Sequence, residues 1–368
     1  MRRQKKFYAW GYADEDLSPD EIKPWEAEIA QRYGLNGFDV TPPPKPEEIT
    51  LRASRVKVPT ALQSMVHTDH LTRLEHSYGK AGFDTTRMFM RSVPNPPDAV
   101  AFPESEQDVV KVLDWCDQVG AKAIPYGGGS SVVKGIEPQA TFDKVVTISL
   151  RHMDKILEVD DMSQAARIQG GIYGPAIEDA LRKSPLTMRH YMQAYRCSTL
   201  GGWIATRSGA AGAWRNRFIR APHYGEHAVA RGILSSTFET SMTWERMRDF
   251  HQKITRIAQD TIRRVTGRDG TVTCRFTHVY PDGPCLYFTF GGILDKRIAL
   301  DQFMEVLSTC TAATVEHGGT TTHHHAVGRF HRPFYDKQRP ELFARALRGA
   351  KRELDPKGMM NPGVLIDP

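Results

Sequence analysis

The chain has 368 residues, of which 40% are hydrophobic and 25% charged, and its net charge is +6. This composition is typical of soluble globular proteins, and the length is sufficient for two domains. No apolar run approaches the ~18 residues of a membrane span, no signal core follows the basic N-terminus, and no basic stripe with interleaved aromatic residues indicates nucleic-acid binding. The five cysteines have no metal-like spacing, which predicts reduced thiols and a cytoplasmic protein.

Helix and strand signals alternate along the first half of the chain. Up to about Val93 the sequence predicts an irregular, partly helical arm that includes the stiff proline-rich segment 42–46. Ser105 is a predicted helix cap, with Asp108 as its partner, and apolar residues follow it at helical spacing. Strands are then predicted at 121–125, 144–150, 155–159 and 165–169, and a helix at about 175–183.

The second half continues the mixed pattern. Apolar residues from Trp244 to Ile257 recur on one helical face, which favours a core-packed helix. Residues 285–290 read as a buried strand, and a last helix at about 339–354 ends before Asp355-Pro356. These elements predict an α+β fold.

Three consecutive histidines, His323, His324 and His325, follow two glycines and three threonines. Histidine titrates near neutral pH, so such a cluster can transfer protons or hold an anion. An expression tag would be terminal and longer, whereas a solvated loop would need no function. Adjacent side chains point in different directions, so we expect no metal site. The glycines and threonines predict a strand that leads into a tight turn.

Two glycine-rich elements lie about 70 residues apart, at 127–131 after a predicted strand and at 198–203. Glycines let backbone amides approach an anion closely. The first element alone is equally consistent with a plain tight turn, and it lacks P-loop or Rossmann spacing. Hydroxyls and a guanidinium follow at 205–209, and together the two clusters suit the diphosphate of a dinucleotide.

These segments resemble the vanillyl-alcohol-oxidase superfamily of FAD enzymes. Ile124–Ser131 and Ser198–Trp203 resemble its FAD-binding elements, and Leu354–Gly363 resembles its C-terminal signature. The resemblance implies a PCMH-type FAD-binding domain and a partial α+β substrate (cap) domain. Three features point to the alkylglycerone-phosphate synthase (alkyl-dihydroxyacetonephosphate synthase) branch, namely the histidine triplet, Thr237–Ser241 before Trp244, and Trp10-Gly11-Tyr12. We expect a helical arm at 1–95, the FAD-binding domain at 96–211, the substrate domain at 212–330 and the C-terminal helix with the signature at 331–368.

The resemblance also implies roles for single residues. Arg220 would hold the substrate phosphate, Tyr287 would accept a proton, and His190 would join the histidine triplet in the active site. From the residues alone, a surface arginine, a core tyrosine and a loop histidine remain the alternatives. The implied FAD contacts fall on Pro125, Tyr126, Gly127, Gly128, Gly129, Ser130, Ser131, Ser198, Thr199, Gly201, Gly202, Thr206, Arg207 and Ser208.

The reaction implied by the resemblance is an exchange in ether-lipid synthesis. The acyl group of acyl-dihydroxyacetonephosphate is replaced by a fatty alcohol through an adduct at flavin N5, with no net oxidation. A base removes a proton beside a carbonyl, and the flavin traps the carbon as an electrophile. The partner would be a small lipid phosphate, with a homodimer and peripheral membrane contact left open. The alternatives are an FAD-linked dehydrogenase or oxidase of a 2-hydroxy acid and a truncated, inactive remnant.

The sequence departs from the family pattern at two places. Met192-Gln193-Ala194 stands where the family has a Pro-Asp-Ser or Pro-Gln-Ser turn against the flavin. A second flavin loop, of the Glu-Gly-Thr-Leu-Gly-Val type, is missing, because the chain passes from about Ala210 directly to the motif with Arg220. We therefore expect an internal deletion that leaves an incomplete sheet with exposed edges and weak or no FAD binding. One FAD per purified chain would contradict this expectation.

Overall fold

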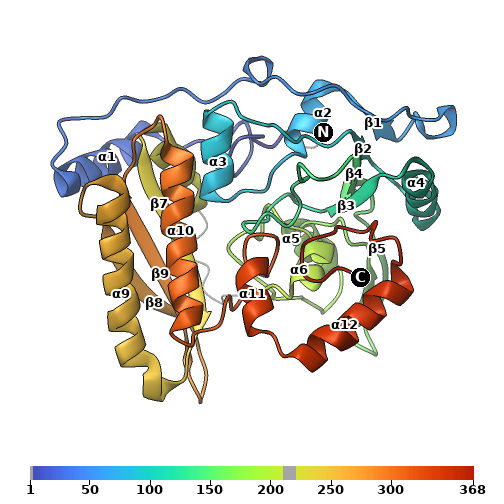
Figure 1. Cartoon of the computed structure of the whole chain (residues 1–368). Helices are drawn as coiled ribbons and strands as arrows, with labels where there is room; N and C mark the ends of the chain where they lie inside the picture. The colour runs from blue at the N-terminus through green and yellow to red at the C-terminus, as the bar shows by residue number, and fades with distance from the viewer. Residues whose placement is uncertain (1–2, 210–220) are drawn as a thin grey trace.

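The computed structural model describes residues 3–209 and 221–368, whose helices and strands form two α+β halves that lie side by side (Figure 1). The mixed fold predicted from the sequence is confirmed. The described helices are α1 (Pro19–Tyr33), α2 (His70–Glu75), α3 (Gly82–Phe89), α4 (Glu106–Val119), α5 (Gly174–Leu181), α6 (Leu200–Thr206), α8 (Tyr224–Ala230), α9 (Trp244–Thr266), α10 (Ala299–Glu316), α11 (Arg332–Gln338) and α12 (Glu341–Leu354). The described strands are β1 (Val66–His67), β2 (Ala99–Ala101), β3 (Lys122–Tyr126), β4 (Val145–Ser149), β5 (Ile156–Asp160), β6 (Ala165–Ile168), β7 (Ile233–Ser241), β8 (Thr271–Val279) and β9 (Pro284–Ile293).

The first half is built on a four-stranded sheet with the order β1-β2-β4-β3. Strands β2, β4 and β3 are parallel, and β1 is added antiparallel at the edge. The predicted cap of α4 is confirmed, because the Ser105 side chain accepts a hydrogen bond from the Asp108 amide at 3.2 Å. Trp115 and Cys116 of this helix are buried in the core that the helix shares with the sheet. Strand β3 ends at Tyr126, so the sheet delivers the glycine loop at 127–129 to a fixed position.

A separate two-stranded sheet, β5-β6, follows this core. Both strands are exposed along most of their length, and Leu157 and Val159 keep 47% and 38% of their surface. A two-stranded sheet is only marginally stable by itself, and its unpaired edges can accept further strands. The exposed sheet is what an incomplete domain would present, although the internal deletion itself stays a prediction.

The second half is a three-stranded antiparallel sheet with the order β7-β9-β8. Helices α9 and α10 cover one face of it (Figure 1), and Phe288, Ile254 and Val306 are buried between them. The apolar face predicted for α9 is confirmed at Ile254, whereas Trp244 at the helix start is 38% exposed. Strand β8 is an exposed edge.

The terminal segments join the two halves. Helices α1, α2 and α3 lie in the segment predicted as a partly helical arm, and α3 is buried against α8 and α10. At the other end, Met360 pairs with Ala123 beside β3, so the C-terminal segment returns to the first half. The predicted last helix begins at Glu341 because Pro340 separates it from α11. No described helix is long and apolar enough to cross a bilayer, and the predicted domain boundaries stay predictions.

Candidate active site

A buried carboxylate, that of Glu239 on β7, fixes the backbone of the histidine triplet. It accepts hydrogen bonds from the amides of His323, His324 and His325 at 2.6, 3.1 and 3.0 Å and from the Thr322 hydroxyl at 2.5 Å. Burial alone would raise the pKa of Glu239, but the adjacent imidazoles and these hydrogen bonds lower it to about 2. Glu239 is therefore an ionised group at neutral pH, and its donors hold the loop in one conformation.

The strand predicted for the threonines before the triplet is wrong, because residues 319–327 form a loop. Instead of a strand ladder, Thr320 forms individual hydrogen bonds with the end of β7. The Thr320 hydroxyl accepts from the Ser241 amide at 2.8 Å, and its carbonyl accepts from the Thr240 hydroxyl at 2.8 Å. Side-chain hydrogen bonds of this kind compete with a regular ladder, so threonine content misled the sequence interpretation.

Tyr287 lies beside the triplet, on β9 and opposite Glu239 in the sheet register. Its ring stacks on His324 with centroids 5.7 Å apart and meets the edge of His325 at 5.5 Å. The Thr237 hydroxyl donates to the phenol oxygen at 3.1 Å, and the Arg275 guanidinium lies 4.9 Å from the ring centroid. Burial raises the pKa of Tyr287, while Thr237 and Arg275 act in the opposite direction. The structure therefore brings the predicted proton acceptor to the predicted histidines.

The imidazoles of the triplet are neutral at pH 7. Burial lowers the pKa of His324 to about 4, although Glu239 opposes the shift, and it also lowers the pKa values of His323 and His325. Neutral imidazole has one free nitrogen lone pair and one N–H. The site thus places several proton acceptors around a protonated phenol, which suits general acid–base chemistry.

Four potential metal ligands also meet here. One donor atom from each of His278, Cys285, His323 and His324 lies within 4.8 Å of the others. The Nδ1 atoms of His323 and His324 are 3.2 Å apart, so the argument that adjacent histidines point apart is wrong for this pair. Three nitrogens and one sulfur form a donor set that Zn²⁺ accepts. The expectation that the chain binds no metal stays a prediction.

The two glycine elements of the first half touch one another. A Cβ atom on Gly127 would lie 2.2 Å from the Thr199 hydroxyl oxygen, and one on Gly128 would lie 2.1 Å from the Cys197 carbonyl oxygen. Gly129 has a φ of +74°, which side chains rarely tolerate. A side chain is thus excluded at 127 by the Thr199 side chain and at 128 by the backbone of Cys197, while the positive φ favours glycine at 129. The two elements are in contact, and their joint role in binding FAD stays a prediction.

The contact region has hydrogen-bond donors without acceptors. Within the described part of the chain, the amides of residues 127–130 donate to no protein group. The Thr199 hydroxyl is also buried and has no partner there. The Thr199 hydroxyl is a buried donor, and such donors are nearly always satisfied in native proteins. Together with the amides of the loop, in which Gly129 is buried and the other three residues are half-buried, it fits an anion such as the diphosphate of FAD.

Other predicted cofactor residues have structural bonds instead. The Ser198 hydroxyl accepts from the Trp203 indole at 2.7 Å and donates to the Ala194 carbonyl. The Thr206 hydroxyl donates to Gly202 inside α6, and the Ser131 hydroxyl accepts from the Gly135 amide. These bonds stabilise the two elements, and the roles predicted for these hydroxyls toward FAD stay predictions. The remaining predicted contacts lie in or next to the same two elements: Pro125, Tyr126, Ser130, Gly201, Arg207 and Ser208.

One predicted active-site residue, His190, is placed away from Tyr287, and another cannot be placed. His190 packs on Trp203, with ring centroids 5.5 Å apart, and Arg220 lies outside the described residues. Gly209, where the first described range ends, does reach the triplet, because a Cβ atom there would lie 3.6 Å from the Cβ of His324. The segment that follows α6 therefore leads directly to the histidine loop.

Sequence reasoning assigned no role to Glu239, Arg275, His278 or Cys285. Glu239 is the one charged residue in β7 and follows Phe238 directly, and this is the signal that could have found it, since unpaired buried carboxylates are rare. His278 and Cys285 lie on neighbouring strands, and their spacing in the sequence resembles no metal motif.

Comparison with known proteins identifies the family. The family described as "FAD linked oxidases, C-terminal domain" matches residues 179–365, about half of the chain, and "FAD binding domain" matches residues 97–220. The chain belongs to the FAD-linked oxidases. Both matches indicate FAD as the cofactor, in agreement with the unmet donors at the glycine elements.

Relatives of this FAD-linked oxidase include alkyldihydroxyacetonephosphate synthases. The Dictyostelium discoideum protein is 33% identical over 192 residues, which are 52% of this chain and 31% of the relative. The Trypanosoma brucei brucei protein is 34% identical over 158 residues, 42% of this chain and 25% of the relative. The matched regions thus span less than a third of either relative's length. A solved alkyldihydroxyacetonephosphate synthase has the same fold, with a TM-score of 0.80 at 16% identity over 97% of each chain.

Proposed function

We propose that this chain is an FAD-dependent enzyme of the alkylglycerone-phosphate synthase type, which exchanges the acyl group of acyl-dihydroxyacetonephosphate for a fatty alcohol. The observation that carries the proposal is the buried phenol of Tyr287 between His324 and His325. The exchange requires removal of a proton beside a carbonyl, and this phenol and its imidazole neighbours are the acid–base groups for that step.

The described side chains suggest how the proton is handled. Burial keeps Tyr287 protonated at rest, so it can accept the substrate proton only when its own proton leaves. Thr237 donates to the phenol oxygen and Arg275 lies over the ring, and both contacts favour the phenolate. The neutral imidazoles of His324 and His325 are the adjacent bases, and Glu239 holds their backbone.

Separate groups would hold the substrate phosphate and FAD. Arg220 is the proposed phosphate ligand, because a guanidinium binds phosphate in a bidentate manner and stays charged. The amides of residues 127–130 and the Thr199 hydroxyl would hold the diphosphate of FAD. When bound, FAD supplies the electrophile that captures the substrate carbon.

A direct exchange assay tests the function. Purified chain, FAD and acyl-dihydroxyacetonephosphate are incubated with radiolabelled hexadecanol, and the labelled ether lipid is counted. Tyr287→Phe should lower the exchange rate by about 100-fold or more, because general acid–base groups contribute that much. Tyr335→Phe is the matched control and should leave the rate unchanged, since the Tyr335 ring on α11 lies against Arg339, and among the described residues its side chain forms no hydrogen bond or ring contact with the histidine loop.

Two outcomes would contradict the proposal. One is a wild-type chain that binds FAD but incorporates no alcohol. The other is an exchange rate that Tyr287→Phe leaves intact. Anaerobic bleaching of the bound flavin by lactate or glycolate, without exchange, would instead establish the dehydrogenase alternative.

A further inference from the structure

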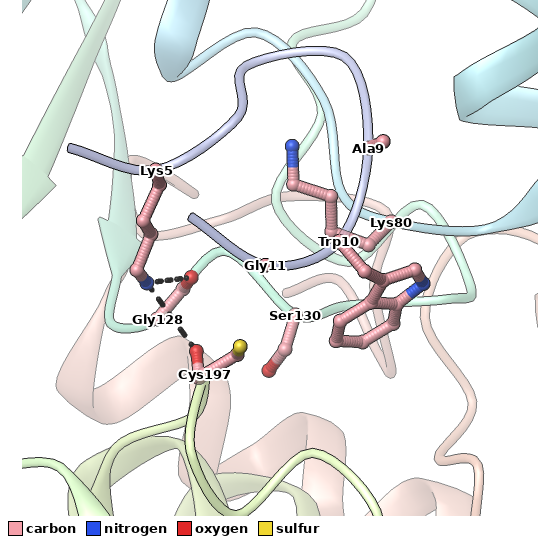
Figure 2. A pocket seen from close by; sticks show the side chains of 8 residues that line it. All are labelled: Lys5, Ala9, Trp10, Gly11, Lys80, Gly128, Ser130 and Cys197. Carbon is pink, nitrogen blue, oxygen red and sulfur yellow. Dashed lines mark hydrogen bonds between the residues drawn. The ribbon is translucent and has the colours of Figure 1, made fainter. Parts of the chain in front are cut away.

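Residues 5–12 of the N-terminal segment, here called the arm, lie over the first glycine element (Figure 2). Residues 5–12 form a turn that is closed by pairing of Lys5 with Tyr12 and by a hydrogen bond from the Lys6 amide to the Gly11 carbonyl at 3.1 Å. This turn and the glycine loop line a small pocket, to which Lys80, Ser130 and Cys197 also contribute. The arm is therefore one wall of the region where the unmet amide donors lie.

Lys5 places a positive charge in this wall. Its ammonium donates to the Gly128 carbonyl at 2.8 Å and the Cys197 carbonyl at 3.4 Å (Figure 2). It also donates to the Tyr173 hydroxyl at 2.8 Å. All three acceptors are neutral, and among the described residues no carboxylate forms an ion pair with Lys5. Burial lowers the pKa of Lys5 to about 8. A desolvated ammonium without a counter-charge is costly, so the site is suited to an anion.

Further bonds hold the arm in this position. The Lys80 ammonium donates to the carbonyls of Lys6 and Phe7 at 3.1 and 2.8 Å, while its amide donates to the Ser131 carbonyl at 2.7 Å. The Lys6 ammonium forms a buried ion pair with Glu226 of α8 at 2.5 Å. One residue, Lys80, thus bonds both the arm and the glycine loop, and the arm is fixed to the second half as well.

We propose that Lys5 is a diphosphate ligand and that the arm, residues 5–12, closes over the diphosphate of FAD. Lys5 would exchange its bonds to the Gly128 and Cys197 carbonyls for bonds to phosphoryl oxygens. The amides of residues 127–130 would bind the same group from the opposite side. A diphosphate supplies the negative charge that Lys5 lacks, and charge-assisted bonds of this kind are short and strong. The inference deepens the proposed function, since it rests on FAD as the cofactor of that reaction.

Isothermal titration of the full chain with inorganic pyrophosphate, FAD and riboflavin tests the proposal. Lys5→Met should lower the affinity of the chain for pyrophosphate and FAD by about tenfold to hundredfold, the loss expected when a hydrogen bond to a charged group is removed. Riboflavin carries no phosphate, so its affinity should not change. Lys5→Arg should retain most of the affinity because it keeps the charge. Lys253→Met, on the exposed face of α9, is the matched control and should bind all three ligands as the wild type does.

The outcomes separate this inference from the proposed function. Pyrophosphate that binds wild type and Lys5→Met equally, or that binds neither, overturns the role of Lys5. Tighter binding by Lys5→Met also overturns it, because the arm would then exclude the ligand. Lys5-dependent binding of FAD without alcohol exchange removes the proposed function and leaves the inference standing. Alcohol exchange by a chain whose FAD affinity does not depend on Lys5 overturns the inference and leaves the proposed function standing.

Discussion

The histidine loop and the glycine loop differ in how their polar groups are satisfied. In the histidine loop, the Glu239 carboxylate accepts bonds from three consecutive amides and the Thr322 hydroxyl. In the glycine loop, the amides of residues 127–130 and the Thr199 hydroxyl have no acceptor within the described ranges 3–209 and 221–368. The first loop is thus complete within the protein, whereas the second has donors that a ligand can fill.

This difference separates two ways of building a site. A loop whose amides are satisfied by a buried carboxylate holds its side chains in place before any substrate arrives, which favours catalysis. A loop with free donors and a nearby unpaired cation gains its stability when an anion binds. Changes to the first loop should therefore affect folding, and changes to the second should mainly affect binding.

Glu239→Ala should give the largest effect on stability. The substitution leaves three amides and one hydroxyl without their acceptor in a buried environment, so we expect a loss of about 3–5 kcal/mol in the free energy of unfolding. Urea denaturation measures it. Glu245→Ala, at an exposed position early in α9, is the matched control and should change stability by less than ~0.5 kcal/mol. A loss below ~1 kcal/mol for Glu239→Ala would show that the loop does not depend on the carboxylate.

Gly128→Ala should have a smaller effect on folding and a clear effect on the cofactor. Its Cβ atom would lie 2.1 Å from the Cys197 carbonyl oxygen, so the two glycine elements must separate. We expect a loss of about 1–3 kcal/mol in stability, as for other overpacked sites, together with loss of FAD binding in a fluorescence titration. Gly349→Ala, in the open interior of α12, is the control and should stabilise the chain by about 0.5–1 kcal/mol. Undiminished FAD binding by Gly128→Ala would mean that the diphosphate lies elsewhere.

The parts of this fold that could be predicted depend on neighbours in the sequence. The cap of α4 at Ser105 involves a residue three positions away, and the glycine loop follows β3 directly. Periodicity and glycine content report such local features. The same local reading also identified the family through its motifs.

Long-range contacts explain what could not be predicted. The conformation of the histidine loop is set by Glu239, which lies 83 residues before Thr322 in the sequence. The position of Lys5 is set by Gly128 and Cys197, which follow it by 123 and 192 residues. A single sequence contains no local signal for either contact, because residues so far apart in the sequence meet only in the folded chain.

Acidification should give the smallest effect, and it acts on the histidine loop. Burial lowers the pKa of His324 from 6.5 to about 4. Between pH 6.5 and pH 4, His324 is therefore protonated in the unfolded chain and neutral in the folded chain. The stabilisation is therefore present above pH 6.5 and is lost as the pH falls toward 4. When the pH is lowered from 7 to 5, the free energy of unfolding of His324→Gln should fall by roughly 1 kcal/mol less than that of the wild type. Urea denaturation at each pH measures the difference. Carboxyl groups with raised pKa values, such as Asp84, act in the opposite direction but equally in both proteins. Identical pH dependence in the two chains would mean that burial does not lower the pKa of His324 in the folded chain.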